Sequence, residues 1–292
     1  MSLAGTVVFI TGGSRGIGEA IAIRLAQEGA SIAIAAKTAD PNSRLPGTIY
    51  SAAAAIEKAG GKALPLKCDI RDEEQVKQAI AKTVETFGSL DILINNASAI
   101  FLAPTSKTDA KRYDLMHSIN GRGTWLVTKT ALPHLLKSKR PRVLTLSPPL
   151  DMNPKWFEAH VAYTMAKYNM SMLVVGHAAE FARLGIAVNG LWPYTVIQTA
   201  ALNMIEGQSA KPNLRTPEIM ADAALCVLQK PSSFTGHLCI DEVVLREAGV
   251  RDFSKYALTP GTRDEEMELD GFLGDAQHAR VNLLRAQHKG KL

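Results

Sequence analysis

Short apolar runs rich in β-branched residues alternate along the chain with longer stretches whose apolar positions recur at helical spacing. The first such pair is "TVVFIT" followed by "IGEAIAIRLAQEG", and the alternation continues to about residue 245. Strands that are apolar throughout are typical of a parallel sheet covered by helices on both faces. The pattern therefore predicts one doubly wound α/β domain over residues 1–245.

The strands of this domain are expected at seven places. They are "TVVFIT", "SIAIAAK", "KALPLKCD", "DILINNAS", "RVLTLS", "IAVNGLW" and "HLCIDEVV". A long helical region is expected near residues 108–138, and residues 38–47 form an unusually long connection after the second strand. Ligands of open parallel sheets bind at the carboxyl ends of the strands, so the residues directly after each apolar run are the first candidates for function.

The last part of the chain, residues 246–292, has mixed charge and few apolar anchors. It does not continue the alternation of strands and helices. We expect a C-terminal extension that wraps around the domain or around a neighbouring subunit.

Composition and charge exclude several classes of protein. The chain has 292 residues, of which 46% are hydrophobic and 21% charged, as in an ordinary globular protein. The net charge of +5 is modest, and the basic run "KSKRPR" at 137–142 lacks interleaved aromatic residues, so no nucleic-acid partner is expected. Three distant cysteines and seven scattered histidines show no metal-ligand spacing, so no metal is expected.

Targeting signals are weak. No apolar stretch approaches the ~18 residues of a membrane span, and the first residues lack the features of an export signal. We therefore expect a cytoplasmic protein. The final "GKL" resembles a peroxisomal signal with glycine in place of serine, which leaves peroxisomal import as the alternative.

A glycine-rich turn, "TGGSRGIG", directly follows the first strand and precedes a helix. Gly12, Gly16 and Gly18 allow a sharp bend and let the backbone approach a pyrophosphate, which the helix N-terminus also attracts. The residues between them, Ser14, Arg15 and Ile17, belong to the same candidate cofactor site. The alternative is a tight turn that holds no ligand.

The end of the second strand indicates which dinucleotide is bound. An acidic residue there usually accepts hydrogen bonds from the adenosine ribose and repels a 2′-phosphate. Here the strand ends in Lys37, no acid occurs before Asp40, and Arg15 lies within the glycine turn. Two cations favour NADP(H) over NAD(H). The alternative is that Lys37 points into solvent.

Tyr163 and Lys167 lie four residues apart in "YTMAK", at the start of a predicted helix, and therefore on one face of it. A phenol is a poor acid–base catalyst at neutral pH unless a nearby cation stabilises its anion. Lys167 can supply that cation and can also hold the nicotinamide ribose. The pair predicts proton transfer to or from a substrate oxygen.

Together, "TGGSRGIG", "NNAS", "SINGRGT" and "YTMAK", in this order, resemble the short-chain dehydrogenase/reductase family. The resemblance implies a Rossmann-type fold and an NAD(P)(H)-dependent alcohol–carbonyl oxidoreductase, usually a dimer or tetramer. It also implies that Tyr163 exchanges the proton, that Asn120 holds a water in the relay, that Asp69 lies near the adenine amine and that Asn96 lies along the nicotinamide.

Longer segments such as "SPPLDMNPKWFEAHVAYTMAKYNMSM" resemble a narrower, hydroxysteroid dehydrogenase-like group of that family. Animal members of the group carry a C-terminal sterol-carrier domain, for which this chain leaves no room. We therefore expect no lipid-delivery role that depends on such a domain.

The chain departs from the family pattern at the end of the fifth strand, in "TLSPPLD". The position expected to hydrogen-bond the substrate oxygen is Pro148, which has no donor. Ser147 lies one residue earlier and would face away unless the two prolines twist the chain. Ser147 is therefore either the hydroxyl that polarises the substrate or a strand-end serine satisfied by the backbone.

Two further departures concern the pocket. Ser98 and Tyr194 replace glycines of the family pattern and make the pocket narrower or more polar. Four aromatic residues near the strand ends suit an extended apolar substrate, although each can also be ordinary packing. They are Trp156, Phe157, Trp192 and Tyr194.

The leading hypothesis is an NADP(H)-dependent oxidoreductase acting on an apolar alcohol or ketone, steroid-like or fatty-acyl-like. Its catalytic residues are Tyr163, Lys167, Asn120 and Ser147. The rival is a catalytically silent sensor or scaffold that keeps the fold and the cofactor, suggested by the departures at Pro148, Ser98 and Tyr194. An epimerase or dehydratase on the same fold is less favoured, because no extra acids lie near the pocket.

Overall fold

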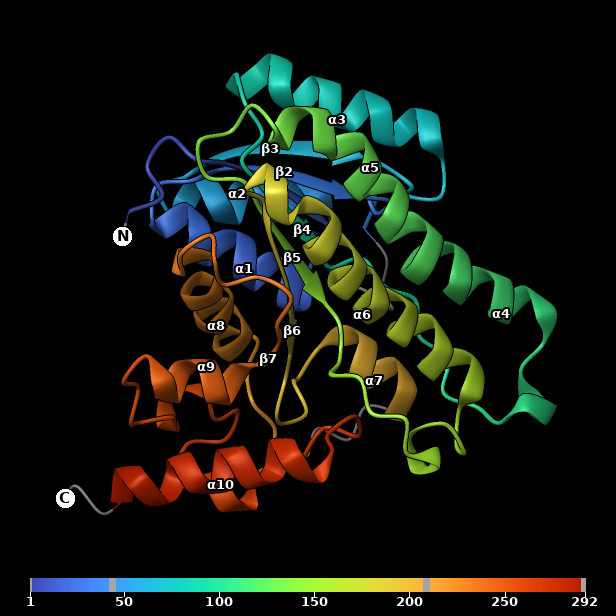
Figure 1. Ribbon diagram of the computed structural model, residues 1–292, viewed down its shortest axis with the longest axis vertical. Helices are drawn as coiled ribbons and strands as arrows, with labels where there is room; N and C mark the ends of the chain where they lie inside the picture. The colour runs from blue at the N-terminus through green and yellow to red at the C-terminus, as the bar shows by residue number, and fades with distance from the viewer. Residues whose placement is uncertain (1, 42–45, 207–210, 290–292) are drawn as a thin grey trace.

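The computed structural model describes residues 2–41, 46–206 and 211–289, and it confirms the predicted doubly wound fold (Figure 1). Seven parallel strands form one sheet in the order β3-β2-β1-β4-β5-β6-β7. The strands are β1 (Val7–Thr11), β2 (Ser31–Ala36), β3 (Lys62–Lys67), β4 (Ile92–Asn95), β5 (Arg142–Leu146), β6 (Ala187–Trp192) and β7 (Leu238–Ile240). Every residue of β1, β4 and β5 is buried, which explains why these segments are mostly apolar.

Helices cover both faces of the sheet, and strand side chains alternate between them. On one face, Val8 and Ile10 of β1 pack against α1 (Gly16–Gln27), α2 (Ile49–Lys58), α8 (Glu218–Gln229) and α9 (Asp241–Glu247). On the other face, Phe9 belongs to the cluster formed with α3 (Glu73–Phe87), α5 (Thr124–Leu135) and α6 (Val161–Phe181). Helix α7 (Ala200–Glu206) follows β6, and helix α10 (Asp275–Lys289) lies in the C-terminal segment.

The long helical region predicted near residues 108–138 is present but is not one regular helix. It consists of α4 (Ala110–Met116), a π-helical segment (His117–Gly123) and α5. A Cβ on Gly121 would lie 2.8 Å from the Asn169 side chain of α6, so the segment packs unusually close to that helix. Wider π turns often occur where a functional side chain must be placed inside a helix, and Asn120 lies in this one.

The C-terminal residues pack onto the domain of their own chain, and the expected boundary at residue 245 falls within α9. Leu273 and Val281 form a buried cluster with Tyr194 and Ile240, and Figure 1 shows α10 beneath α9. Apolar anchors are therefore more numerous than the sequence suggested. The further ones are Phe253, Tyr256, Met267 and Phe272.

A buried ion network ties the same region together. The fully buried Arg215 donates to the Phe253 carbonyl at 3.0 Å and pairs with Asp264 at 2.8 Å. Asp264 also pairs with Arg246, whose guanidinium contacts Glu242. Because each buried charge has a partner of opposite sign, the network fixes the segment without leaving an isolated charge.

Two sequence features fall partly outside the described residues. They are residues 42–45 of the long connection 38–47 and the terminal "GKL" at 290–292. Among the helices that the structure describes, none combines the length and apolar character needed to cross a lipid bilayer.

Candidate active site

The glycine turn lies tightly against the end of β4. Gly12 has φ +67°, and a Cβ on it would lie 2.8 Å from the Ala97 Cα, so a larger residue does not fit. A Cβ on Gly18 would collide with the side chain of Asn96. The turn therefore has the close backbone geometry that a pyrophosphate requires.

Helix α1 starts directly after this turn, at Gly16, and its N-terminus has no side-chain cap. The N–H groups of the first turn, which includes Ile17, lack helical acceptors and carry the positive end of the helix dipole. Ser14 is buried beneath them. Arg15 is oriented by the loop after β2, since it donates to the carbonyls of Pro46 at 2.9 Å and Gly47 at 2.7 Å. This arrangement fits the pyrophosphate of a dinucleotide.

Asn96, predicted to lie along the nicotinamide, uses its side chain to hold the glycine turn. Its amide nitrogen donates to the carbonyls of Thr11 and Gly12, each at 3.0 Å. The ends of β1 and β4 are thereby fastened to each other. Asn96 contributes to the shape of the cofactor site through these two bonds.

The predicted adenosine end contains three charged groups in contact. Lys37 Nζ lies 3.3 Å from Asp69 Oδ2, and Arg71 forms a close bidentate pair with the same carboxylate. The Arg71 guanidinium, together with Lys37, holds the pKa of Asp69 well below its usual range. Sequence reasoning missed Arg71, although its position two residues after Asp69 could have suggested it.

Tyr163 and Lys167 both lie in the first turns of α6, beside the carboxyl ends of β5 and β6. Lys167 Nζ donates to the carbonyl of Leu146, the last residue of β5, at 2.7 Å. The same ammonium lies 4.8 Å from the ring centroid of Trp192, the last residue of β6. Among the described residues, the Tyr163 hydroxyl has no hydrogen-bond partner, which leaves it available to a ligand.

Burial changes the acid–base properties of the pair. It raises the pKa of Tyr163 above its usual value, and it lowers the pKa of Lys167 to about 7. Tyr163 is therefore a neutral phenol at physiological pH, the form that donates a proton to a carbonyl oxygen. If the charge of Lys167 lowers the pKa of Tyr163, this effect must first overcome the increase caused by burial.

Asn120 is fully buried, and its side chain faces the loop after β4. Its Oδ1 accepts from the Ala99 N–H at 2.8 Å, and its Nδ2 donates to the Ala99 carbonyl at 3.0 Å. The π-helical segment thus fixes the loop that starts with Asn96. A role for Asn120 in a proton relay stays a prediction, with which these two hydrogen bonds are compatible.

Ser147 is fully buried and extends the pairing of β5 with β6, because its N–H donates to the Leu191 carbonyl at 3.2 Å. Its Oγ lies 3.1 Å from the position of a Cβ on Gly190 and has no hydrogen-bond partner in the described chain. The backbone partner expected for a strand-end serine is thus not found. Pro148 offers its carbonyl to Ser171 at 2.6 Å.

An aromatic cluster covers the catalytic pair, and the C-terminal segment supplies its central ring. The centroid of Phe272 lies 5.8 Å from that of Tyr163 and 5.9 Å from that of Trp192. It also lies 6.4 Å from the ring of Trp156, and Phe157 packs edge-on against Tyr168 at 5.4 Å. Three of the four aromatics predicted to line the pocket therefore belong to the cluster centred on Phe272, which itself contacts Tyr163.

Tyr194 is the exception among those four aromatics. Its hydroxyl lies 3.1 Å from His278 Nδ1 of α10, and its ring is buried in the C-terminal cluster. Tyr194 thus supports the C-terminal helix. Ser98 is exposed and lies in the loop that Asn120 holds.

Sequence reasoning missed Phe272 and Asp270. Asp270 Oδ1 accepts from the Trp192 indole N–H at 2.7 Å and from the Phe272 N–H at 2.9 Å. The only local signal was the apolar pair "FL" within the polar segment "ELDGFLGD". Its partners are too distant in sequence for any spacing rule to find.

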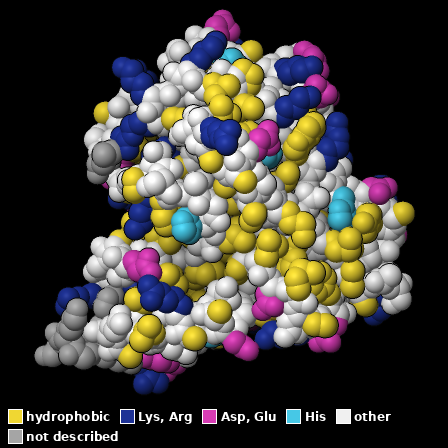
Figure 2. Space-filling view, in the orientation of Figure 1, with side chains coloured by type: hydrophobic (Ala, Val, Ile, Leu, Met, Phe, Trp, Pro, Cys, Tyr) yellow, Lys and Arg dark blue, Asp and Glu magenta, His cyan; other side chains and the backbone are white. Residues whose placement is uncertain are grey.

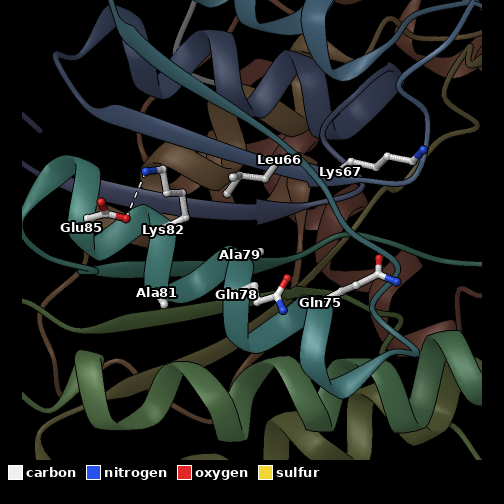
Figure 3. Close-up of a pocket in the computed structure, with 8 residues that line it drawn as sticks. All are labelled: Leu66, Lys67, Gln75, Gln78, Ala79, Ala81, Lys82 and Glu85. Carbon is white, nitrogen blue, oxygen red and sulfur yellow. Dashed lines mark hydrogen bonds and ion pairs between the residues drawn. The ribbon is translucent and has the colours of Figure 1, made fainter.

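A hollow of about 460 Å³ lies elsewhere, between the edge strand β3 and α3 (Figure 3). Polar side chains surround much of it, and Lys82 there pairs with Glu85 at 3.1 Å. None of its lining residues belongs to the glycine turn or to the Tyr163–Lys167 pair. We regard it as a solvent-filled groove at the open edge of the sheet.

Comparison with known proteins agrees with this geometry. The model of the short chain dehydrogenase family matches residues 6–209. The chain belongs to this family. A structure from Xanthomonas campestris superposes with a TM-score of 0.90 at 52% identity, covering 94% of this chain and 100% of the other. A short chain dehydrogenase from Mycobacterium thermoresistibile gives a TM-score of 0.88 at 49% identity over 94% and 96% of the two chains.

The narrower resemblance is confirmed as well. Hydroxysteroid dehydrogenase-like protein 2 from Danio rerio is 58% identical over 259 residues, which cover 89% of this chain and 62% of the relative. The chain therefore spans less than two thirds of the length of that relative.

Proposed function

We propose that this chain is an NADP(H)-dependent oxidoreductase that transfers hydride between the nicotinamide and the carbon of an apolar alcohol or ketone. The observation that carries the proposal is the position of Lys167. Its ammonium donates a hydrogen bond to the carbonyl of Leu146 at the end of β5, and Tyr163 lies one helical turn away. Both residues lie at the carboxyl ends of the strands, where the glycine turn also lies. Family membership supports a nicotinamide cofactor.

The chain's own residues supply binding and proton transfer. The glycine turn and the N-terminus of α1 would hold the pyrophosphate, and the bound dinucleotide would supply or accept the hydride. Tyr163, kept neutral by burial, donates its proton to the substrate oxygen during reduction. Lys167 balances the charge of the phenolate that remains, Asn120 continues the relay, and Ser147 is the candidate for polarising the carbonyl.

The preference for NADP(H) rests on the charges at the adenosine end. Lys37, Arg71 and Arg15 lie near the ends of β2, β3 and the glycine turn, and Asp69 is the acid in direct contact with the first two. Asp69 pairs with both Lys37 and Arg71, so one negative charge faces two cations, and the exposed Lys37 side chain remains accessible to a 2′-phosphate. This charge balance supports NADP(H) over NAD(H).

An apolar substrate is supported by the rings around Tyr163. Trp156, Trp192 and Phe272 come from three separate segments and pack against one another, with Phe272 against Tyr163 and Trp192 against Lys167. A flat apolar ketone, steroid-like or fatty-acyl-like, would find stacking partners there. The rings do not distinguish between these two substrate classes.

We also propose a homo-oligomer, formed through the helices that flank the active site. Large apolar side chains are exposed on α5 and α6, and Figure 2 shows hydrophobic side chains gathered where α4, α5 and α6 lie. Trp125 is 44% exposed and Met172 53% exposed. A second copy of the chain would remove this apolar surface from water.

The rival function is a dinucleotide sensor that turns nothing over. It is supported by Pro148, which has no donor for a substrate oxygen, and by the lack of a hydrogen bond between Ser147 and the catalytic pair. The intact Tyr163–Lys167 pair argues against it, because a protein that only binds the cofactor has no use for that pair.

The deciding experiment is NADPH oxidation, with NADH in parallel, over a panel of apolar ketones and 3-ketoacyl thioesters. Turnover that prefers NADPH and falls at least ~100-fold in Tyr163→Phe would support the oxidoreductase. Tight binding of NADPH without turnover of any compound would support the sensor. Binding of NADPH by Tyr163→Phe, measured by fluorescence, is the control for folding.

A further inference from the structure

We propose that the C-terminal segment 267–274 completes the active site and that Asp270 within it is a positioning residue: it holds Trp192 against Lys167, and its negative charge keeps Lys167 protonated. This inference rests on the proposed function, in which Tyr163 and Lys167 form the proton-transfer pair. It assigns a role to residues outside the 6–209 range of the family match.

A continuous chain of contacts leads from the segment to the catalytic lysine. Asp270 Oδ1 accepts the indole N–H of Trp192 at 2.7 Å, and the Trp192 ring lies 4.8 Å from Lys167 Nζ. A ring that donates a hydrogen bond to a carboxylate cannot rotate freely. Asp270 therefore fixes the aromatic face that the ammonium contacts, and cation–π attraction depends on that placement.

The same carboxylate oxygen also fixes the ring that covers the tyrosine. It accepts the Phe272 N–H at 2.9 Å, and the Phe272 ring packs edge-on against Tyr163 at 5.8 Å. Tyr163 is only 5% exposed in this arrangement. One acceptor thus orients the neighbours of both members of the pair.

Asp270 also acts through its negative charge. Both hydrogen bonds go to Oδ1 and could be accepted equally well by a neutral amide, so the effect of the charge is separate from them. The carboxylate raises the pKa of Lys167 and that of Tyr163, whereas burial lowers the first and raises the second. Burial raises the pKa of Asp270 itself to about 6, against the lowering effect of the hydrogen bonds from Trp192 and Phe272, so it is ionised at neutral pH. Asp270 therefore favours the protonated form of both groups, which is the state ready to reduce a carbonyl.

Three other titratable groups face Tyr163 and the segment 267–274. His160 contacts the rings of Tyr163 and Phe272, and burial lowers its pKa, so it is neutral above pH 7. Asp151 faces Gly274, and the N–H of Asn153 lowers its pKa. Burial raises the pKa of Tyr168, which packs against Phe272. These groups keep one charge state between about pH 7 and pH 9.

Lys155 is the remaining cation on the neighbouring loop. Its ammonium lies over the Trp156 ring and 3.6 Å from Asp275, at the solvent-exposed side of the cluster. Asp275 belongs to the same C-terminal region as Asp270 but its side chain is 98% exposed. It therefore provides a matched control for the removal of a carboxylate.

The test is Asp270→Asn, which keeps an oxygen acceptor for Trp192 and Phe272 and removes only the charge. With NADPH and a ketone that the wild type reduces, the alkaline limb of the pH profile of kcat/KM should move to lower pH by about one unit. Asp275→Asn should leave the limb unchanged. If Asp270→Asn does not fold, Asp270→Ser provides a smaller neutral acceptor for which the same shift is expected.

A second readout needs neither substrate nor turnover. NMR of 13Cε-labelled lysine would follow the titration of Lys167, whose signal is assigned by its loss in Lys167→Arg. A lower midpoint in Asp270→Asn than in the wild type would support the inference even if no compound is turned over and the proposed function fails. An unchanged midpoint would overturn it, whatever the enzyme does.

Discussion

The side chain of Asn120 forms two hydrogen bonds with the backbone of Ala99, accepting its N–H at 2.8 Å and donating to its carbonyl at 3.0 Å. Both groups lie in a site from which water is largely excluded, because Asn120 is fully buried. The Asn120 side-chain amide can form both hydrogen bonds in one orientation only, with Oδ1 toward the N–H and Nδ2 toward the carbonyl. Asn120 therefore holds the Ala99 end of the loop beside the predicted nicotinamide position, whereas Thr11 holds its start at Asn96 and Ala97.

Asn120→Asp should destabilise the fold by about 2 kcal/mol at pH 7, because a carboxylate oxygen would replace the donor that faces the Ala99 carbonyl. The buried acid would have a pKa raised above its unfolded value. The destabilisation is therefore full above that pKa and is relieved as the pH falls through it. Urea unfolding at pH 7 and pH 5 measures this. Asn203→Asp, at an exposed acceptor of Gln198, should change stability little.

Lys37→Asp should weaken the preference for NADPH over NADH by tenfold or more, about 1.4 kcal/mol, because the 2′-phosphate would meet an acid instead of a cation. Titration of each dinucleotide by fluorescence gives the ratio of the two dissociation constants. Lys62→Asp is the control, because Lys62 is exposed at the amino end of β3, away from the carboxyl ends of the strands. An unchanged ratio in Lys37→Asp would remove the argument from charge.

Asp241→Asn should raise the free energy of unfolding above that of the wild type by more at pH 8 than at pH 5. Asp241 Oδ1 accepts the N–H groups of Tyr194 and Glu242, whereas its Oδ2 is buried without a partner in the described residues, and burial raises its pKa to about 7. Because the folded pKa exceeds the unfolded value, wild-type stability falls as the pH rises through this interval. The variant carries no such loss.

The difference in urea midpoint between Asp241→Asn and the wild type should therefore grow with pH. Asp40→Asn, at an exposed position, serves as the control and should show a constant difference. A gap that is the same at pH 5 and pH 8 would mean that Asp241 does not titrate in this range.

Ser147→Ala should raise stability by about 1 kcal/mol, because the substitution removes a buried hydroxyl that has no hydrogen-bond partner in the described chain. The same variant decides the catalytic question that the sequence leaves open. If Ser147 polarises the substrate carbonyl, turnover should drop about 100-fold at unchanged NADPH affinity. Wild-type turnover would exclude that role.

Met172→Glu should shift the protein toward a smaller assembly, because a charge on the exposed apolar side of α6 cannot be buried without a partner. Light scattering across a dilution series gives the mass of each species. Lys82→Glu on α3 changes the charge outside this surface and should leave the mass unchanged.

Local patterns were sufficient to predict the sheet and to select the candidate residues at its edge. The order of strands, the glycine turn and the Tyr163–Lys167 pair each depend on spacings within a few residues, which the sequence displays directly. The orientation of Ser147 was not predictable, because it depends on backbone torsions set by Pro148 and on the pairing with β6. Asp270 and Phe272 were missed because their partners are recognisable only in three dimensions.

The bond between Trp192 and Asp270, 78 residues apart in sequence, has a consequence for synthesis. A ribosome releases the glycine turn and α6 well before it releases Asp270 and Phe272, and domains fold from the N-terminus as they emerge. The sheet can therefore assemble while Tyr163 is still uncovered. Tyr163 acquires its aromatic cover only when the segment 267–274 docks, so this part of the molecule is completed later in synthesis than the sheet beneath it.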